Sequence, residues 1–171
     1  MTSRERILAA IDHKSLDRVP TDIWATQEVW NKLRARFGND ELVRLALHID
    51  GIIDLKPAYI GPPLPACPPD ADIDHRVFFG VWGVELKWLG HGTGRYLEQA
   101  NWPFAGLATA EELSHAMWPS PDWFDYGGIR AQAARLHETN AVKSGYMAPF
   151  YLHNITRGME LSLMDPLTDP D

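Results

Sequence analysis

The fold of this chain depends most on residues 2–24, which read T-S-R-E-R-I-L-A-A-I-D-H-K-S-L-D-R-V-P-T-D-I-W. Thr2 and Glu5 have the spacing of a capping box, in which a hydroxyl and a carboxylate satisfy free amides at a helix start. Apolar residues at helical spacing come next, followed by a charged turn. Residues 19–24 are predicted to form a short strand, with Pro20 near its start, where a missing N–H is tolerable. The stretch therefore predicts a helix that precedes the first strand of a sheet.

The remainder of the chain is predicted to alternate between helices and extended segments. In chain order these are helices over 29–37 and 40–47, an extended segment over 49–55, a proline-rich loop over 57–69, an antiparallel hairpin within 77–100, a helix over 126–138, a strand over 141–147 and a helix over 152–163. This order predicts a mixed α/β fold.

The bulk composition is that of one ordinary soluble domain: 171 residues, of which 45% are hydrophobic and 23% charged. The net charge of -7 argues against binding to nucleic acid or to anionic membranes, which both require a cationic face. The sequence has no apolar run of spanning length, and no secretory signal is expected. Cys67 is the single cysteine and cannot form an internal disulfide, so a cytoplasmic location is expected.

Three local patterns have some features of binding sites. The run D-A-D-I-D-H (70–75) lacks the glycine and glutamate of an EF-hand at its sixth and twelfth places, so an exposed acidic loop is favoured over a metal site. The run G-H-G-T-G (90–94) is predicted to be a hairpin turn, because no strand-to-helix context surrounds it. The seven histidines stand far apart and Cys67 stands alone, so no metal site is expected in this chain.

Five pieces of the sequence, in order along most of the chain, resemble the uroporphyrinogen decarboxylase superfamily, and in particular its branch of decarboxylase-like proteins and corrinoid methyltransferases. They are R-E-R-I-L-A-A-I-D-H-K (4–14), D-R-V-P-T-D-I-W (17–24), V-W-G-V (81–84), W-P-S-P-D-W-F-D (118–125) and R-G-M-E-L-S-L-M-D-P-L-T-D-P-D (157–171).

The resemblance implies a (β/α)₈ TIM barrel, whose active site lies at the carboxyl ends of its strands. Such a barrel needs about 250 residues. Residues 1–171 are therefore expected to be its N-terminal portion, a partial barrel with an antiparallel β-hairpin excursion. In that interpretation the segments 19–24 and 141–147 are parallel neighbours. Asp169 and Pro170, a good helix start at the end of the chain, favour a truncated protein; a polar terminus is the alternative.

The resemblance also implies the chemistry. Family decarboxylases act in porphyrin biosynthesis without a cofactor and carry an M-R-Q-A-G-R-Y run after the first strand. Here residues 25–30 read A-T-Q-E-V-W, so corrinoid-linked methyl transfer is favoured over tetrapyrrole decarboxylation. That branch uses zinc held by later strands and a corrinoid protein partner. Both are expected only of the full-length parent, and this chain alone is expected to be inactive.

At the mouth of such a barrel, Asp22 is the candidate catalytic residue, for proton transfer or for partnering a cationic centre. Trp24, Tyr146 and Met147 are the candidates for binding a small-molecule or tetrapyrrole-type substrate. Packing inside the barrel is the alternative role for these residues. Exposed strand edges also predict a homo-oligomer.

A function of another class remains open at this point. The chain could be a complete, non-catalytic α+β module that binds a ligand or partner through its aromatic and proline-rich surface. Such a module is expected to bury residues 161–167 against its own core, whereas a barrel portion is expected to leave an apolar face open.

Overall fold

A computed structural model describes residues 1–92, 94–145 and 148–168 of the chain. The chain divides into two compact units. Unit 1 comprises Met1–Pro57 and Tyr126–Gly145, and unit 2 comprises Ala58–Asp125 and Tyr146–Asp171. Every helix in the described part of the chain is too short or too polar to cross a lipid bilayer.

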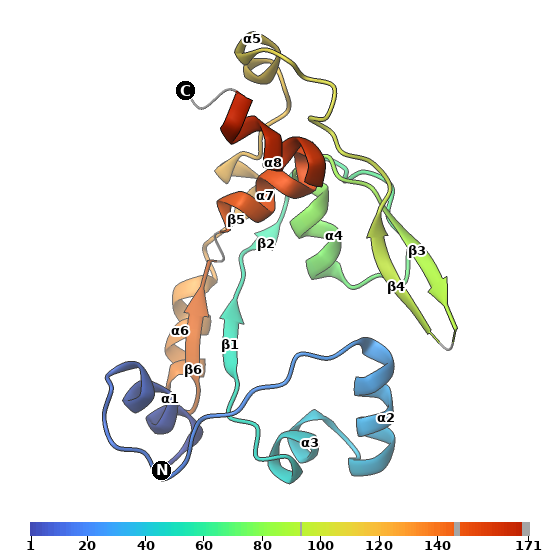
Figure 1. The fold of residues 1–171 in the computed structure, drawn as a ribbon. Helices are drawn as coiled ribbons and strands as arrows, with labels where there is room; N and C mark the ends of the chain where they lie inside the picture. The colour runs from blue at the N-terminus through green and yellow to red at the C-terminus, as the bar shows by residue number, and fades with distance from the viewer. Residues whose placement is uncertain (93, 146–147, 169–171) are drawn as a thin grey trace. The chain divides into compact units, whose positions relative to one another are not determined.

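Unit 1 combines four helices with one parallel strand pair (Figure 1). Its elements are α1 (Ser3–Ile11), α2 (Gln27–Phe37), α3 (Asp40–Ala46), β1 (Ile52–Leu55), α6 (Ile129–His137) and β6 (Ala141–Ser144). The capping box of Thr2 and Glu5 at the start of α1 is confirmed, and Gly38 ends α2 with a φ of 108°, a conformation that favours glycine.

The strands β1 and β6 pair in parallel, in register from Ile52 opposite Ala141 to Leu55 opposite Ser144. A parallel pair requires a crossover connection, and the crossover here ends with α6, which packs against both strands. Residues 58–125 of unit 2 are inserted in that connection. The side chains of Leu55 and Ala141 are buried in the core of unit 1.

The prediction that residues 19–24 form the first strand is wrong, because these residues take part in no ladder. Pro20 has no N–H, and the N–H of Thr21 donates to the carboxylate of Asp50 at 2.9 Å. The carbonyl oxygen of Thr21 accepts the N–H groups of both Asp50 and Gly51. The predicted pairing of 19–24 with 141–147 is therefore also wrong, and β1 is the parallel neighbour of β6.

Unit 2 contains short antiparallel pairs and four helices (Figure 1). Its elements are β2 (Ala58–Tyr59), α4 (Ile73–Gly80), β3 (Leu86–His91), β4 (Gly94–Gln99), α5 (Ala110–Ser114), the 3₁₀ turn η1 (Pro121–Trp123), β5 (Phe124–Asp125), α7 (Pro149–Arg157) and α8 (Met159–Thr168). The predicted hairpin is confirmed as β3 and β4, and β2 pairs with β5.

Two boundaries predicted in unit 2 are wrong. The antiparallel pattern was expected from residue 77, but α4 begins after its N-cap Asp72 and extends to Gly80. One helix was expected over 152–163, but Gly158, with a φ of 92°, separates α7 from α8.

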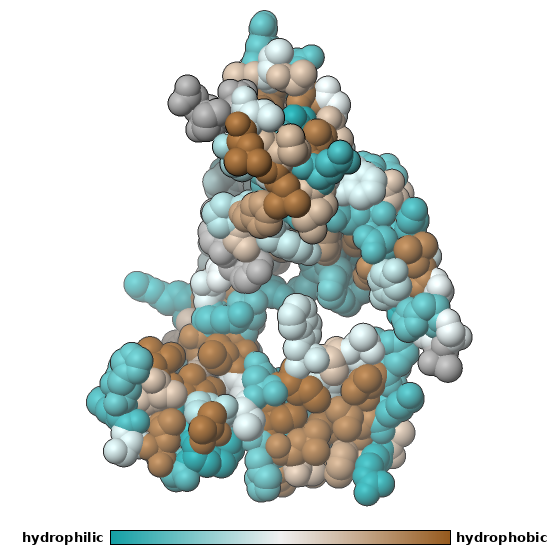
Figure 2. Space-filling view, in the orientation of Figure 1, coloured by the Kyte–Doolittle hydropathy of each residue, from teal (hydrophilic) through white to brown (hydrophobic). Residues whose placement is uncertain are grey.

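The described residues thus form a mixed α/β structure with eight α-helices and three two-stranded sheets, which confirms the α/β class. Their strands close no barrel. Each unit has its own buried residues, and large apolar side chains also remain at the surface, as the brown areas of Figure 2 show.

Candidate functional site

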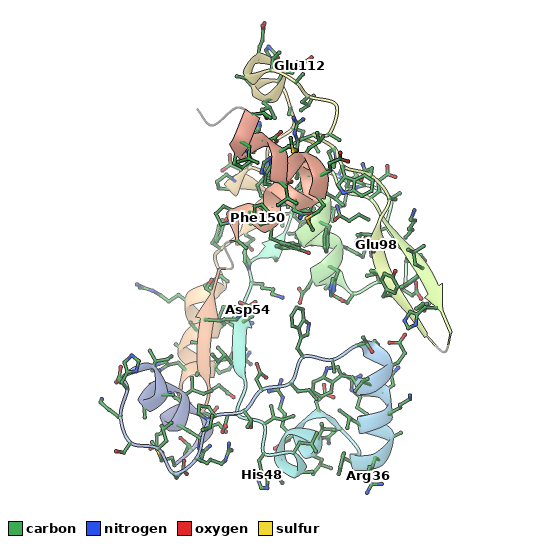
Figure 3. The ribbon with its side chains drawn as sticks, viewed as in Figure 1. Arg36, His48, Asp54, Glu98, Glu112 and Phe150 are labelled. Atoms are coloured by element: carbon green, nitrogen blue, oxygen red, sulfur yellow. The ribbon has the colours of Figure 1, made fainter. Side chains whose placement is uncertain are left out.

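The carboxyl end of the β1–β6 pair is where the parallel architecture places a ligand site. In barrels and open α/β sheets, ligands bind beyond the carboxyl ends of the parallel strands. Here Asp54 of β1 (labelled in Figure 3) lies in register with Lys143 of β6. Neighbours in register on parallel strands project to the same face, so a carboxylate and an ammonium group share that face.

Lys56 extends this charged group just past the end of β1. Its Nζ lies 3.9 Å from the Asp54 carboxylate, whose side chain is 31% exposed. The opposite face of the strand pair carries the apolar residues Ile53, Leu55 and Val142, with Ser144 in register with Leu55. Asp54, Lys56 and Lys143 therefore form a solvent-accessible polar group, which we call the strand-end cluster. Its ammonium groups can attract an anion.

The predicted catalytic residue Asp22 lies at the other end of β1. A Cβ added at Gly51, just before β1, would lie 3.6 Å from Oδ1 of Asp22. Gly51 precedes Asp54 by three residues, about 10 Å along an extended chain. Asp22 Oδ1 accepts the N–H of Ile23 at 2.8 Å, and its side chain is exposed. The fold therefore does not bring Asp22 to the strand-end cluster.

The predicted substrate-binding residues fall into two groups. Trp24 has a relative exposure of 103%, so its indole faces solvent. Tyr146 and Met147 lie outside the described residues.

A buried ion-pair network surrounds Asp50, and the sequence patterns did not predict it. Asp50 has a fully buried side chain that accepts from Arg6 Nη1 at 2.5 Å, from Arg18 Nη1 at 2.7 Å and from the N–H of Thr21 at 2.9 Å. Arg6 also donates to both carboxylate oxygens of Asp17 at 2.7 Å. We call these residues the Asp50 network.

The Asp50 network shifts the pKa values of its members. Burial alone would raise the pKa of Asp50, but the Thr21 N–H and the guanidinium groups of Arg18 and Arg6 outweigh it, and the pKa falls to about 2. Hydrogen bonds from Arg6 hold the pKa of Asp17 well below its usual range. The ionised carboxylates are saturated with donors, so the network is suited to holding residues 17–21 in place rather than to chemistry. Its signal in the sequence is the set of charges between Arg4 and Arg18, which look like an ordinary polar turn.

Two carboxylates of the acidic run 70–75 accept hydrogen bonds from other groups of the protein. Asp72 caps α4 and accepts the N–H groups of Asp74 and His75. Asp70 accepts from Trp88 Nε1 at 2.8 Å and from Arg95 Nη2 at 2.6 Å. Within the residues that the structure describes, no group of three or more His, Cys, Asp or Glu is arranged to hold a metal ion.

A second network of hydrogen bonds, centred on Arg157, holds the carboxyl-terminal helices of unit 2. We call it the Arg157 network. Arg157 at the end of α7 donates from Nη1 to the carbonyl oxygens of Phe104 at 2.9 Å and Leu107 at 2.5 Å. Its Nε donates to Asp165 of α8 at 2.9 Å, and His153 Nε2 contacts the same carboxylate at 3.0 Å. The guanidinium thus joins α7, α8 and the loop after Phe104.

Comparisons with protein-family models, with curated proteins and with solved structures find no match for this chain. Its function is therefore inferred from the residues and geometry described above.

Proposed function

We propose that this chain forms the opening β–α–β portion of a barrel enzyme of the uroporphyrinogen decarboxylase superfamily, and that the enzyme acts in corrinoid-linked methyl transfer on a small-molecule substrate. The observation that carries the proposal is the strand-end cluster on the parallel pair β1–β6. Parallel strands joined through a helix, with polar residues at their carboxyl ends, are the repeating unit from which such barrels are built.

The open edges of the strand pair support the barrel part of the proposal. In a closed barrel every strand has two neighbours. Among the described residues, β1 pairs only with β6, and β6 only with β1, so one edge of each strand is available to a further strand. Barrel closure by other strands would cover these edges and place Asp54 and Lys143 at the lining of the barrel.

The residue types favour methyl transfer over tetrapyrrole decarboxylation. The arginine-bearing run that marks the decarboxylases is absent after residue 24. The strand-end cluster offers two lysines and one carboxylate, which suit a small anionic substrate. The described residues do not fit a zinc ion, because their histidines stand apart and Cys67 lies in the proline-rich loop. We therefore derive no step through a metal.

The exposure of apolar side chains on α8 argues against the alternative, a complete non-catalytic module. Such a module requires residues 161–167 to be buried, yet Leu163, Met164 and Leu167 are exposed. Leu167 is 78% exposed. An open apolar face on α8 is the arrangement expected of a barrel portion.

Ligand titration of a full-length version, in which residues 1–171 are continued by the remaining strands of the barrel, tests the proposal, because a corrinoid is not expected to bind to this chain alone. Methylcobalamin and uroporphyrin, an octacarboxylate tetrapyrrole, are each titrated against the wild type, Lys143→Met and the matched surface control Lys14→Met, with tryptophan fluorescence as the readout. We expect methylcobalamin to bind and Lys143→Met alone to weaken it, by about tenfold, the effect of one charge-assisted contact. Binding of uroporphyrin alone would favour the decarboxylase. Binding of neither, or equal binding by all three proteins, contradicts the proposal.

A further inference from the structure

Asp50 and Gly51 form the one Asp–Gly pair in the sequence, which contains no Asn–Gly pair. In an Asp–Gly pair, the glycine has no side chain to shield its backbone nitrogen, so this nitrogen can attack Cγ of the preceding carboxyl group. The N–Cγ bond forms, the Cγ–OH bond breaks, and the hydroxyl leaves with the amide proton as water. Water then opens the resulting five-membered succinimide at one of its carbonyls, which gives either aspartate or isoaspartate.

Isomerisation at this position would remove the central carboxylate of the Asp50 network. Isoaspartate is joined to the next residue through its side-chain carbonyl, so the backbone gains one carbon atom. The free carboxylate is then attached directly to Cα and reaches one methylene less far. The ion pairs of Asp50 with Arg6 and Arg18 require the longer reach, so the network is not re-formed after the reaction.

The folded chain holds both reacting groups of the Asp–Gly pair in place. The N–H of Gly51 donates to the carbonyl oxygen of Thr21 at 3.2 Å, which fixes the attacking nitrogen. Oδ1 of Asp50 accepts from Arg6 at 2.5 Å and from Arg18 at 3.0 Å. Oδ2 accepts from Arg18 at 2.7 Å and from the N–H of Thr21 at 2.9 Å. These hydrogen bonds keep Cγ from turning towards the nitrogen.

The charge and burial of Asp50 oppose the reaction as well. The protonated carboxyl group is the form that loses water readily. Burial raises the pKa of Asp50, but the Thr21 N–H and the guanidinium groups lower it to about 2, so the carboxylate is ionised at neutral pH. The side chain of Asp50 is fully buried and Gly51 is buried too. A Cβ added at Gly51 would lie 2.5 Å from Nη1 of Arg44, so this guanidinium covers the glycine.

We propose that Asp50 is a site of spontaneous isomerisation to isoaspartate, and that opening of the Asp50 network sets the rate of this modification. Opening frees the Gly51 N–H from Thr21, admits water and allows the carboxyl group to take a proton. Local opening of this kind costs less free energy than global unfolding, so it recurs in the folded protein. The product accumulates with time because the network does not re-form. The modification is independent of the proposed enzymatic role.

Peptide mapping with electron-transfer fragmentation, which distinguishes isoaspartate from aspartate, measures the rate at Asp50 in buffer and in denaturing urea. We expect the wild-type rate to be about 100-fold lower in buffer, the protection that a buried ion pair provides. Arg18→Met should raise the rate in buffer about tenfold, the effect of one charge-assisted contact. The matched control Arg135→Met, at an exposed arginine of α6, should leave it unchanged. Absence of isoaspartate at Asp50 in urea, equal wild-type rates in buffer and urea, or equal rates in the three proteins overturns the proposal.

Hydrogen exchange keeps the test decisive if Arg18→Met fails to fold. Exchange of the Gly51 N–H and isomerisation at Asp50 are both measured on the wild type over a series of urea concentrations below the unfolding transition. Both reactions require release of this N–H from Thr21, so we expect the two rates to rise by the same factor. A rise in one rate while the other stays constant contradicts the proposal.

Discussion

Arg6 of α1 donates to Asp50 across 2.5 Å, and both side chains are almost completely buried. The same guanidinium binds Asp17 and the carbonyl oxygen of Met1. Asp50 lies just before β1, so this contact fixes the first helix to the entrance of the parallel strand pair. The charged residues within 2–24 therefore join α1 to the segment just before β1, which is distant along the chain.

Asp50→Asn is expected to destabilise unit 1 by about 3 kcal/mol, because Arg6 and Arg18 would lose the ionised partner that compensates their desolvation. Urea denaturation followed by circular dichroism measures this loss. Asp12→Asn removes an exposed carboxylate that pairs with Lys14, and it is expected to change stability by less than about 0.5 kcal/mol. Equal effects of the two substitutions would mean that the Asp50 network contributes no more than a surface ion pair.

Lowering the pH should weaken the Asp50 network over a defined range of pH. The pKa of Asp50 is about 2 in the folded chain, below its ordinary value of 3.8. A lowered folded pKa means that the unfolded chain binds the proton more readily, so the stabilisation is complete above about pH 4 and is lost as pH falls through 2. Because other carboxylates also titrate there, the informative quantity is the difference in unfolding free energy between wild type and Asp50→Asn. That difference should shrink from about pH 5 to about pH 2; a constant difference would contradict the assignment.

Local signals in the sequence predicted much of the fold. The capping box of Thr2 and Glu5 is present, and the helix predicted over 29–37 ends at Phe37, because each feature depends on atoms a few residues apart. The strand at 19–24 was predicted wrongly because the conformation of these residues depends on Asp50, which is distant along the chain. The strand-end cluster was missed for a related reason, since Asp54 and Lys143 become neighbours only through the register of β1 and β6.

The substitution Arg157→Lys tests the hydrogen bonds that Arg157 makes with Phe104, Leu107 and Asp165. A lysine keeps the charge but carries all its donors on one nitrogen, so it cannot reproduce the separate contacts of Nη1 with the carbonyls of Phe104 and Leu107 and of Nε with Asp165. We expect a loss of about 2 kcal/mol in thermal or urea unfolding. The control Arg135→Lys, on the exposed surface of α6, should stay within about 0.5 kcal/mol of the wild type. Equal stability of the two variants would show that the three-way contact is dispensable.

His48→Gly is expected to stabilise the chain. His48 follows α3 with a φ of 53°, and the bonds from its N–H to Leu45 and from the Ile49 N–H to Arg44 form the pattern that usually places glycine there. Figure 3 labels this residue. Relief of the left-handed strain should raise the unfolding free energy by about 1 kcal/mol. His48→Ala keeps the strain and should give no gain; a gain of equal size would assign the effect to the lost imidazole.

The pairing of β1 with β6 is the relationship on which the proposed function depends most, and a disulfide between the two strands measures it directly. In a Cys67→Ser background, Asp54→Cys with Lys143→Cys places two thiols on neighbouring residues of a parallel pair, within the separation that a disulfide spans. Asp22→Cys with Lys143→Cys represents the alternative pairing of residues 19–24. We expect rapid oxidation of the first pair and none of the second, by mass spectrometry of the non-reduced peptides. A disulfide between positions 22 and 143, or none between 54 and 143, would contradict the account.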